Sequence, residues 1–182
     1  EPGDFTDMAY LGRDAEPADD AILATTVLTK RSIDWVGHGG RMIFFASPNN
    51  CDFVEHVDFW RQLPLIDTAH PIMRDFPFAG YLDQQFFSLA TAHGIAAVKG
   101  KGRSHPLLTG IGLRDFRVLN YLLEMRIGRG TLLVTTLNFF AGCGMQAHNL
   151  RENVAGRFLF HNMVRYLVAG TGYNTSEQYT YS

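Results

Sequence analysis

Amide side chains follow two strongly apolar runs of this sequence. Asn49 and Asn50 come after the run at 41–47, and Asn138 comes after the run at 131–137. If both runs are strands of an open α/β sheet, ligands collect beyond their carboxyl ends. Amides in such a crevice can hydrogen-bond sugar hydroxyls or water. The competing interpretation of the two adjacent asparagines is an ordinary turn, since Asn tolerates left-handed backbone.

A thiol with an unusual setting is Cys143, in the run 142–146 (GCGMQ) ahead of a predicted helix. A helix N-terminus and a nearby His can activate a thiol as a nucleophile. The run resembles, in compressed form, the nucleophile elbow of glutamine amidotransferases. However, the usual Gly-x-Cys-x-Gly spacing is missing, and little chain remains downstream for the partner His and Glu. We therefore predict no catalytic residue, and keep Cys143 as the nucleophile of a competing hypothesis.

Aromatic rings and polar side chains share the segment 70–89 (HPIMRDFPFAGYLDQQFFSL). Rings stack on sugar faces, while carboxylates and amides hydrogen-bond sugar hydroxyls. Tyr81, Asp83 and Gln84 are therefore candidates for sugar binding. The competing interpretation is that this segment is a buried connection whose rings pack over the edge of a sheet.

Neither composition nor spacing indicates a metal, a cofactor, a nucleic acid or a membrane. No pair of histidines, and no His with a Cys, has the spacing of a zinc site, so we predict no metal and no cofactor. The net charge of −2 gives no electrostatic reason to bind nucleic acid. No apolar run reaches the length that spans a bilayer. The two cysteines make no disulfide framework, so the sequence assigns no compartment.

A strand, a helix and a second strand open the ordered part of the chain. The apolar run 21–26 predicts a buried strand, and Thr29 can cap a helix that ends near His38. Gly39-Gly40 then stops the helix before the strand at 41–47. Such short connections favour a parallel pair with a crossover helix.

A hairpin and a long helix close the domain. Apolar side chains alternate over 119–127, a Gly-Arg-Gly turn follows at 128–130, and the run 131–137 returns as an antiparallel strand. Two apolar rows predict a helix over 149–168 that packs on the sheet.

The region between these elements is less regular. A short helix is predicted at 53–60, a short strand at 94–98 and a loop over the Gly-, Lys- and Arg-rich stretch 99–115. Together the elements predict a three-layer α/β sandwich with a mostly parallel sheet and an antiparallel edge hairpin.

Three parts of the sequence carry a resemblance to a known family. They are 39–46 (GGRMIFFA), the His-Pro, Phe-Pro and DQQFF steps of 70–87, and 124–134 (EMRIGRGTLLV) with the closing helix. Over residues 21–168 the chain resembles a class I glutamine amidotransferase-like accessory domain of bacterial β-galactosidase-type glycoside hydrolases. The resemblance implies a flavodoxin-like sheet that has lost its catalytic cysteine. Residues 1–20 are then an irregular lead-in, and residues 169–182 a polar tail.

These observations lead to one expected function and two alternatives. We expect a non-catalytic accessory domain of a carbohydrate-processing protein, which binds sugar weakly or supports a neighbouring catalytic domain or a homo-oligomer. The first alternative is a cysteine-dependent, amidotransferase-like hydrolase that uses Cys143. The second is a protein–protein interaction module that uses the aromatic segment.

Overall fold

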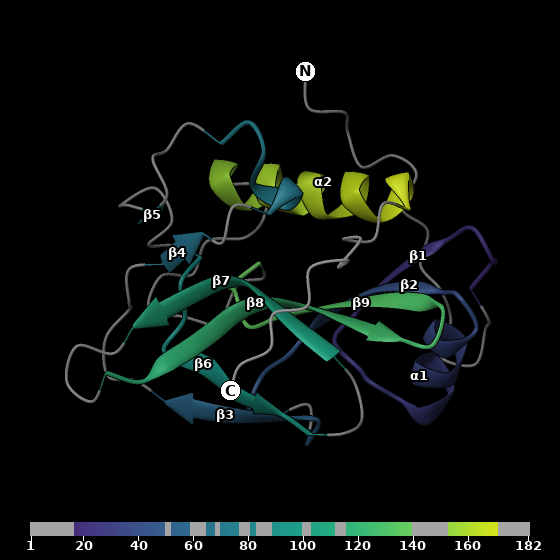
Figure 1. The fold of residues 1–182 in the computed structure, drawn as a ribbon, viewed down its shortest axis with the longest axis horizontal. Coiled ribbons are helices and arrows are strands. Elements are labelled where there is room, and N and C mark those ends of the chain that lie inside the picture. The colour runs from purple at the N-terminus through teal and green to yellow at the C-terminus, as the bar shows by residue number, and fades with distance from the viewer. Residues whose placement is uncertain are drawn as a thin grey trace.

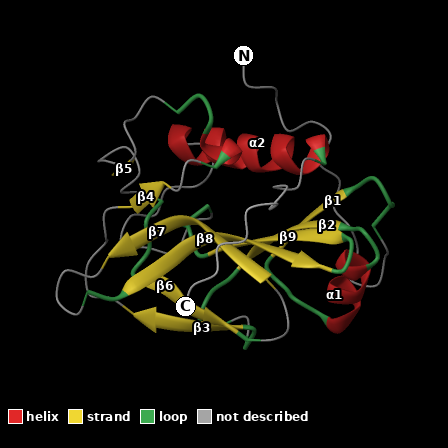
Figure 2. Cartoon of the chain, viewed as in Figure 1, coloured by secondary structure: helices red, strands yellow, loops and turns green. Residues whose placement is uncertain are grey.

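The computed structural model describes residues 17–49, 52–58, 65–67, 70–76, 81–82, 89–99, 103–111, 116–139 and 153–170. These residues form one curled, nine-stranded sheet with two α-helices and a short 3-10 helix (Figures 1 and 2). In chain order the elements are β1 (Ile22–Thr25), α1 (Lys30–Gly37), β2 (Arg41–Phe45), β3 (Val54–Asp58), β4 (Leu65–Asp67), the 3-10 helix η1 (Pro71–Met73), β5 (Tyr81–Leu82), β6 (His93–Val98), β7 (Arg103–Ile111), β8 (Val118–Ile127), β9 (Gly130–Thr135) and α2 (Val154–Ala169).

The parallel part of the sheet is the β1-α1-β2 unit together with β9. β1 pairs with β2, and β2 pairs with β9, in parallel, so the predicted crossover is confirmed. Thr29 begins α1 as predicted: its hydroxyl accepts from the Ser32 amide, and the Ser32 side chain closes a capping box. Gly39, at φ +122°, then turns the chain toward β2 in a conformation that only glycine adopts readily.

The rest of the sheet is antiparallel. β8 and β9 form the predicted hairpin, whose turn places Gly128 at φ +57°. β7 pairs along β8 although the stretch 99–115 predicts a loop. Proline lacks a backbone donor, and the register shifts directly after Pro106, so the ladder skips Leu107.

Two hydrophobic cores lie on opposite faces of the sheet. Ile43 and Phe45 point into the core beneath α2, which also contains Leu159 and Met163 of that helix. The alternate residues of β2 lie in the second core with Val36 of α1, Val54 of β3 and Ile95 of β6. In Figure 1 the β3–β6 pair accordingly lies on the side of the sheet opposite α2.

The prediction of a flavodoxin-like, mostly parallel sandwich is wrong. Two pairings, β1-β2 and β2-β9, are parallel, and all other pairings between the described strands are antiparallel. The segment predicted as a helix at 53–60 contains strand β3 instead. β3 and β6 bury their apolar side chains on the face that a second layer of helices covers in a flavodoxin-like fold.

Helix α2 closes the other face, as its two apolar rows predict. Asn153 caps it by accepting from the Gly156 amide at 2.8 Å, and Gly170 ends it in the left-handed conformation. No helix of the described residues has the length and apolar character needed to cross a bilayer.

Candidate functional site

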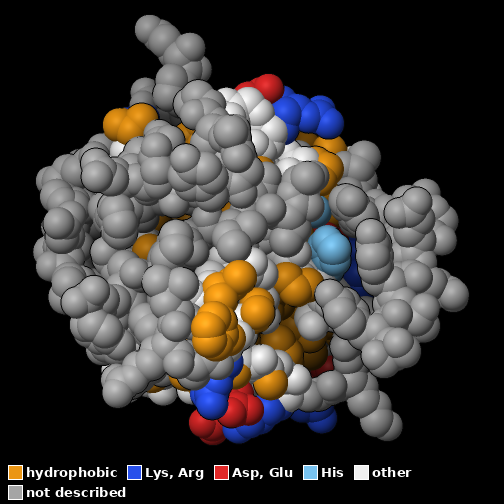
Figure 3. Space-filling view, turned by 60° about the vertical axis from the view of Figure 1, so that its left-hand side comes forward, with side chains coloured by type: hydrophobic (Ala, Val, Ile, Leu, Met, Phe, Trp, Pro, Cys, Tyr) orange, Lys and Arg blue, Asp and Glu red, His pale blue; other side chains and the backbone are white. Residues whose placement is uncertain are grey.

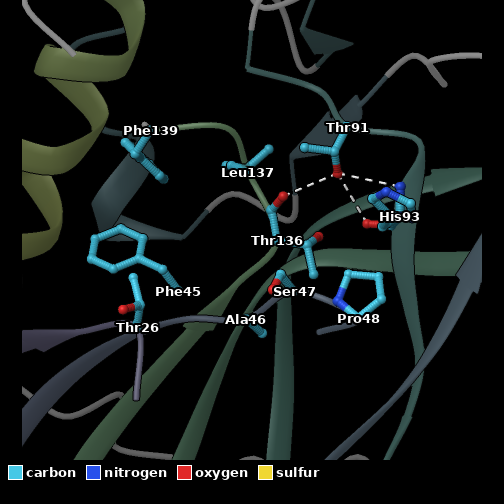
Figure 4. Close-up of a pocket in the computed structure, with 10 residues that line it drawn as sticks. All are labelled: Thr26, Phe45, Ala46, Ser47, Pro48, Thr91, His93, Thr136, Leu137 and Phe139. Atoms are coloured by element: carbon cyan, nitrogen blue, oxygen red, sulfur yellow. Dashed lines mark hydrogen bonds between the residues drawn. The ribbon is translucent and has the colours of Figure 1, made fainter. Parts of the chain in front are cut away.

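A pocket of about 250 Å3 opens at the carboxyl ends of the parallel strands (Figure 4). Residues that directly follow the strands line it: Thr26 after β1, Ser47 and Pro48 after β2, and Thr136 and Leu137 after β9. Phe45, Ala46, Thr91, His93 and Phe139 complete the lining. This is the edge where ligands of open α/β sheets bind, because the strand ends leave a crevice between their connections.

One side of the pocket is aromatic and is held by α2. The rings of Phe45 and Phe139 meet edge to face, with centroids 5.5 Å apart. Phe160 of α2 stacks on Phe45 at 6.2 Å and lies 6.1 Å from Phe139. The packing of these rings on α2 therefore holds the aromatic side of the pocket in place without a ligand.

The opposite side carries hydroxyls, and the hydroxyl of Thr91 is already bonded to the backbone of the protein. Its Oγ1 lies 3.0 Å from the carbonyl oxygens of both Thr136 and His93, and it accepts from the His93 amide at 3.3 Å (Figure 4). Thr91 thus ties the start of β6 to the end of β9. Its single proton is shared between these carbonyl oxygens, so it has no donor left for a ligand.

The hydroxyl of Thr136 is different, because it has no hydrogen-bond partner among the described residues. Thr136 is only 5% exposed. In the view of Figure 4 it lies between Thr91 and Ser47. A buried polar group without a partner costs about 1–3 kcal/mol of stability. A ligand that hydrogen-bonds this hydroxyl removes the cost, so Thr136 is a candidate ligand contact.

The described lining of the pocket carries no fixed charge. It includes no Asp, Glu, Lys or Arg, and His93 is its one titratable side chain. The site therefore suits an uncharged ligand with an apolar surface and hydrogen-bonding groups.

The sequence predicted this edge of the sheet but different residues. Asn49 is exposed, just past Pro48 of the rim. Asn138 is buried between two lining residues, and its backbone N–H donates to the Leu89 carbonyl at 2.8 Å, but its side chain does not line the pocket. Tyr81 lies in β5, at the end of the strand order farthest from β1.

Four predicted residues, Asn50, Asp83, Gln84 and Cys143, lie outside the described residues. The lining hydroxyls that sequence reasoning missed, Ser47 and Thr136, stand inside the two predicted strand runs. The same rule about carboxyl ends could have found them, had hydroxyls been considered beside amides.

A second polar group, the buried acid cluster, lies between the sheet and α2. It consists of Glu124 on β8, Tyr166 on α2, His70 before η1, Arg126 and His105. The Tyr166 hydroxyl donates to Glu124 Oε2 at 2.8 Å, and Arg126 Nε lies 3.2 Å from Oε1. The Ile72 amide donates to His70 Nδ1 at 3.2 Å, so the proton of a neutral His70 sits on Nε2, 3.5 Å from Glu124 Oε2.

The environment of the buried acid cluster favours an ionised Glu124. Burial pushes the pKa of its carboxyl up, but hydrogen bonds from His70 and Tyr166 and the charge of Arg126 outweigh burial and hold the pKa below its usual value. Burial, together with the charge of His70, lowers the pKa of His105. The carboxylate contacts groups from three elements, so we interpret the cluster as an anchor of α2 and η1 on the sheet. Among the described residues no cluster of His, Cys, Asp and Glu could hold a metal ion.

Comparison with known sequences assigns the chain to a family. Residues 23–180 match the family described as a domain of unknown function, DUF8487, and the protein belongs to this family. No curated protein matches the chain.

Several solved structures are similar to it at low identity. The cytoplasmic protein STM1381 from Salmonella typhimurium LT2 has a TM-score of 0.46 and 12% identity, over 74% of this chain and 58% of that one. The exo-β-1,4-mannosidase Op5Man5 from Opitutaceae bacterium strain TAV5 has a TM-score of 0.45 and 14% identity, over 81% and 25%. A ThuA-like protein from Parabacteroides merdae has a TM-score of 0.46 and 12% identity, over 78% and 64%. The chain spans less than two thirds of each of these proteins, and the scores are too low to assign a function.

Proposed function

We propose that this chain is a non-catalytic accessory domain of a carbohydrate-processing protein, and that the pocket at the carboxyl ends of β1, β2 and β9 binds a neutral sugar weakly. The observation that carries the proposal is the Thr136 hydroxyl, which is buried at the pocket without a hydrogen-bond partner among the described residues. A sugar hydroxyl both donates and accepts, as this group does. The accessory role is supported by the resemblance of residues 21–168 to such domains of glycoside hydrolases.

The rest of the lining fits the same ligand. The aromatic side of the pocket suits the C–H surface of a sugar ring, and the absence of fixed charge in the described lining disfavours acidic or phosphorylated compounds. Weak binding follows from the small size of the pocket and from the few hydrogen bonds that its described lining offers, since each contact contributes only a limited free energy.

Calorimetric or saturation-transfer titration with glucose, galactose, mannose and xylose tests the proposal. We expect at least one of these sugars to bind, and Thr136→Val to weaken binding about tenfold, equivalent to about 1.4 kcal/mol. Thr136→Ser is the matched control, because it keeps the hydroxyl and should bind within about twofold of wild type. Absence of binding at tens of millimolar sugar, or equal binding by Thr136→Val, would contradict the proposal.

A protein–protein interaction role is the second candidate, and one surface favours it. Ile111 and Val118 pair where β7 ends and β8 begins, and Phe116 beside them is 79% exposed at φ +53°. Figure 3, which turns that side of the molecule forward, shows hydrophobic side chains gathered at the surface. Exposed apolar patches mark interaction sites. If this role is correct, the protein sediments as an oligomer and Phe116→Ser lowers its mass to that of a monomer.

A further inference from the structure

We infer that the pocket accepts a single terminal sugar unit and not the middle of a polysaccharide chain. This inference rests on the proposed sugar-binding function and adds the class of ligand. It follows from the depth and the size of the pocket.

The floor of the pocket is closed. Ala46, Thr136, Leu137 and Phe139 are all buried, with Phe139 only 1% exposed. These residues belong to or adjoin the cores on the two faces of the sheet, so among the described residues the floor is packed protein. A segment from the middle of a chain continues at both of its ends, so it would have to lie across the rim and would not reach this floor.

The rim, by contrast, is open to solvent. Thr26 and Pro48 are exposed, and Ser47 and His93 are half-buried. Among the described residues, the rim is therefore the side from which a ligand enters. The free hydroxyl of Thr136 belongs to the buried floor, so a sugar must insert its end to reach it.

The volume sets the length of what can be inserted. The pocket measures about 250 Å3, below the range of about 300–1,000 Å3 found for drug-sized ligands. It holds one sugar ring, and further units of a chain would project past the rim into water. They would gain little contact, so affinity should not grow with chain length.

The experiment uses the full chain and the monosaccharide that binds best among glucose, galactose, mannose and xylose, with its di- and trisaccharides. Calorimetry or saturation-transfer titration should give dissociation constants within about twofold for all three lengths. Saturation transfer should concentrate on protons of one terminal ring. Thr136→Val should weaken the three ligands by the same factor, whereas Thr136→Ser should not.

Two different failures can be distinguished. If no sugar binds, the proposed function fails, and this inference falls with it. If sugars bind but affinity rises tenfold or more from mono- to trisaccharide, or saturation spreads evenly along the chain, the site is an open groove. Sugar binding then stands, and the terminal-unit inference is wrong.

Discussion

Tyr166 donates its hydroxyl proton to Oε2 of Glu124 across 2.8 Å and 42 residues of sequence. The bond joins α2 to the central strand β8. Both side chains are buried, so water can replace this hydrogen bond only when α2 separates from the sheet. This pair holds one of the two layers that enclose the core next to the pocket.

Removing the donor should destabilise the protein. Tyr166→Phe leaves a buried carboxylate with one hydrogen bond fewer, and hydrogen bonds to charged groups contribute about 1.5–3 kcal/mol. Urea unfolding followed by circular dichroism should show a loss of that size with an unchanged m-value. A loss below about 0.5 kcal/mol would mean that the anchor contributes little.

The same substitution at Tyr121 should act in the opposite direction. The Tyr121 hydroxyl is fully buried and has no hydrogen-bond partner among the described residues, and burial raises its pKa to about 12. Tyr121→Phe removes an unsatisfied polar atom and keeps the ring, so the free energy of unfolding should stay equal or rise by about 1 kcal/mol. Thermal unfolding of the two Tyr→Phe variants side by side controls for the loss of a hydroxyl as such; a destabilised Tyr121→Phe would reveal a partner for this group.

Thr136→Val should stabilise the protein while it weakens sugar binding. The hydroxyl is buried without a partner among the described residues, and valine has nearly the same shape. We expect the free energy of unfolding to rise by about 1 kcal/mol, because the variant no longer buries an unpaired hydroxyl. Residues that bind ligands often lower stability in this way. A lower melting temperature in calorimetry would show that the hydroxyl supports the fold and would remove the main support for the proposed site.

Stability should decline in two stages as the pH falls. Burial first, and the charge of His70 next, lower the pKa of His105 below its usual value of 6.5. The unfolded chain therefore takes up this proton before the folded protein does, and stability decreases as the pH drops below 6.5. The pKa of Glu124 is also lowered, so its contribution is complete above the usual value of 4.5 and is lost as the pH falls through the folded value.

Two variants separate these stages. Urea midpoints between pH 8 and pH 3 should show a weaker decline below pH 6.5 for His105→Gln. The decline below pH 4.5 should weaken for Glu124→Gln. An identical pH profile for Glu124→Gln and wild type would mean that this carboxyl has the same pKa in both states.

Local signals were sufficient for the elements that are continuous in sequence. The cap at Thr29, the glycines after α1, the turn at 128–130 and the apolar rows of α2 all act within a few residues, because caps, turns and helix faces depend on near neighbours. The β1-α1-β2 crossover, the β8–β9 hairpin and α2 are therefore as predicted. A pocket does lie at the carboxyl ends of β2 and β9, whereas ligand binding at this edge stays a prediction.

Tertiary packing decided the rest. Residues 103–111 contain Pro106 and Gly110, which favour a loop, yet they pair along β8 as strand β7. The segment at 54–58 became a strand because it pairs with β6 and covers the second core. Strand pairing and the contact between Tyr166 and Glu124 join residues that are distant in the chain, so no local pattern encodes them. The flavodoxin-like expectation failed for this reason, and the side chains that line the pocket emerged only once the strands were assembled.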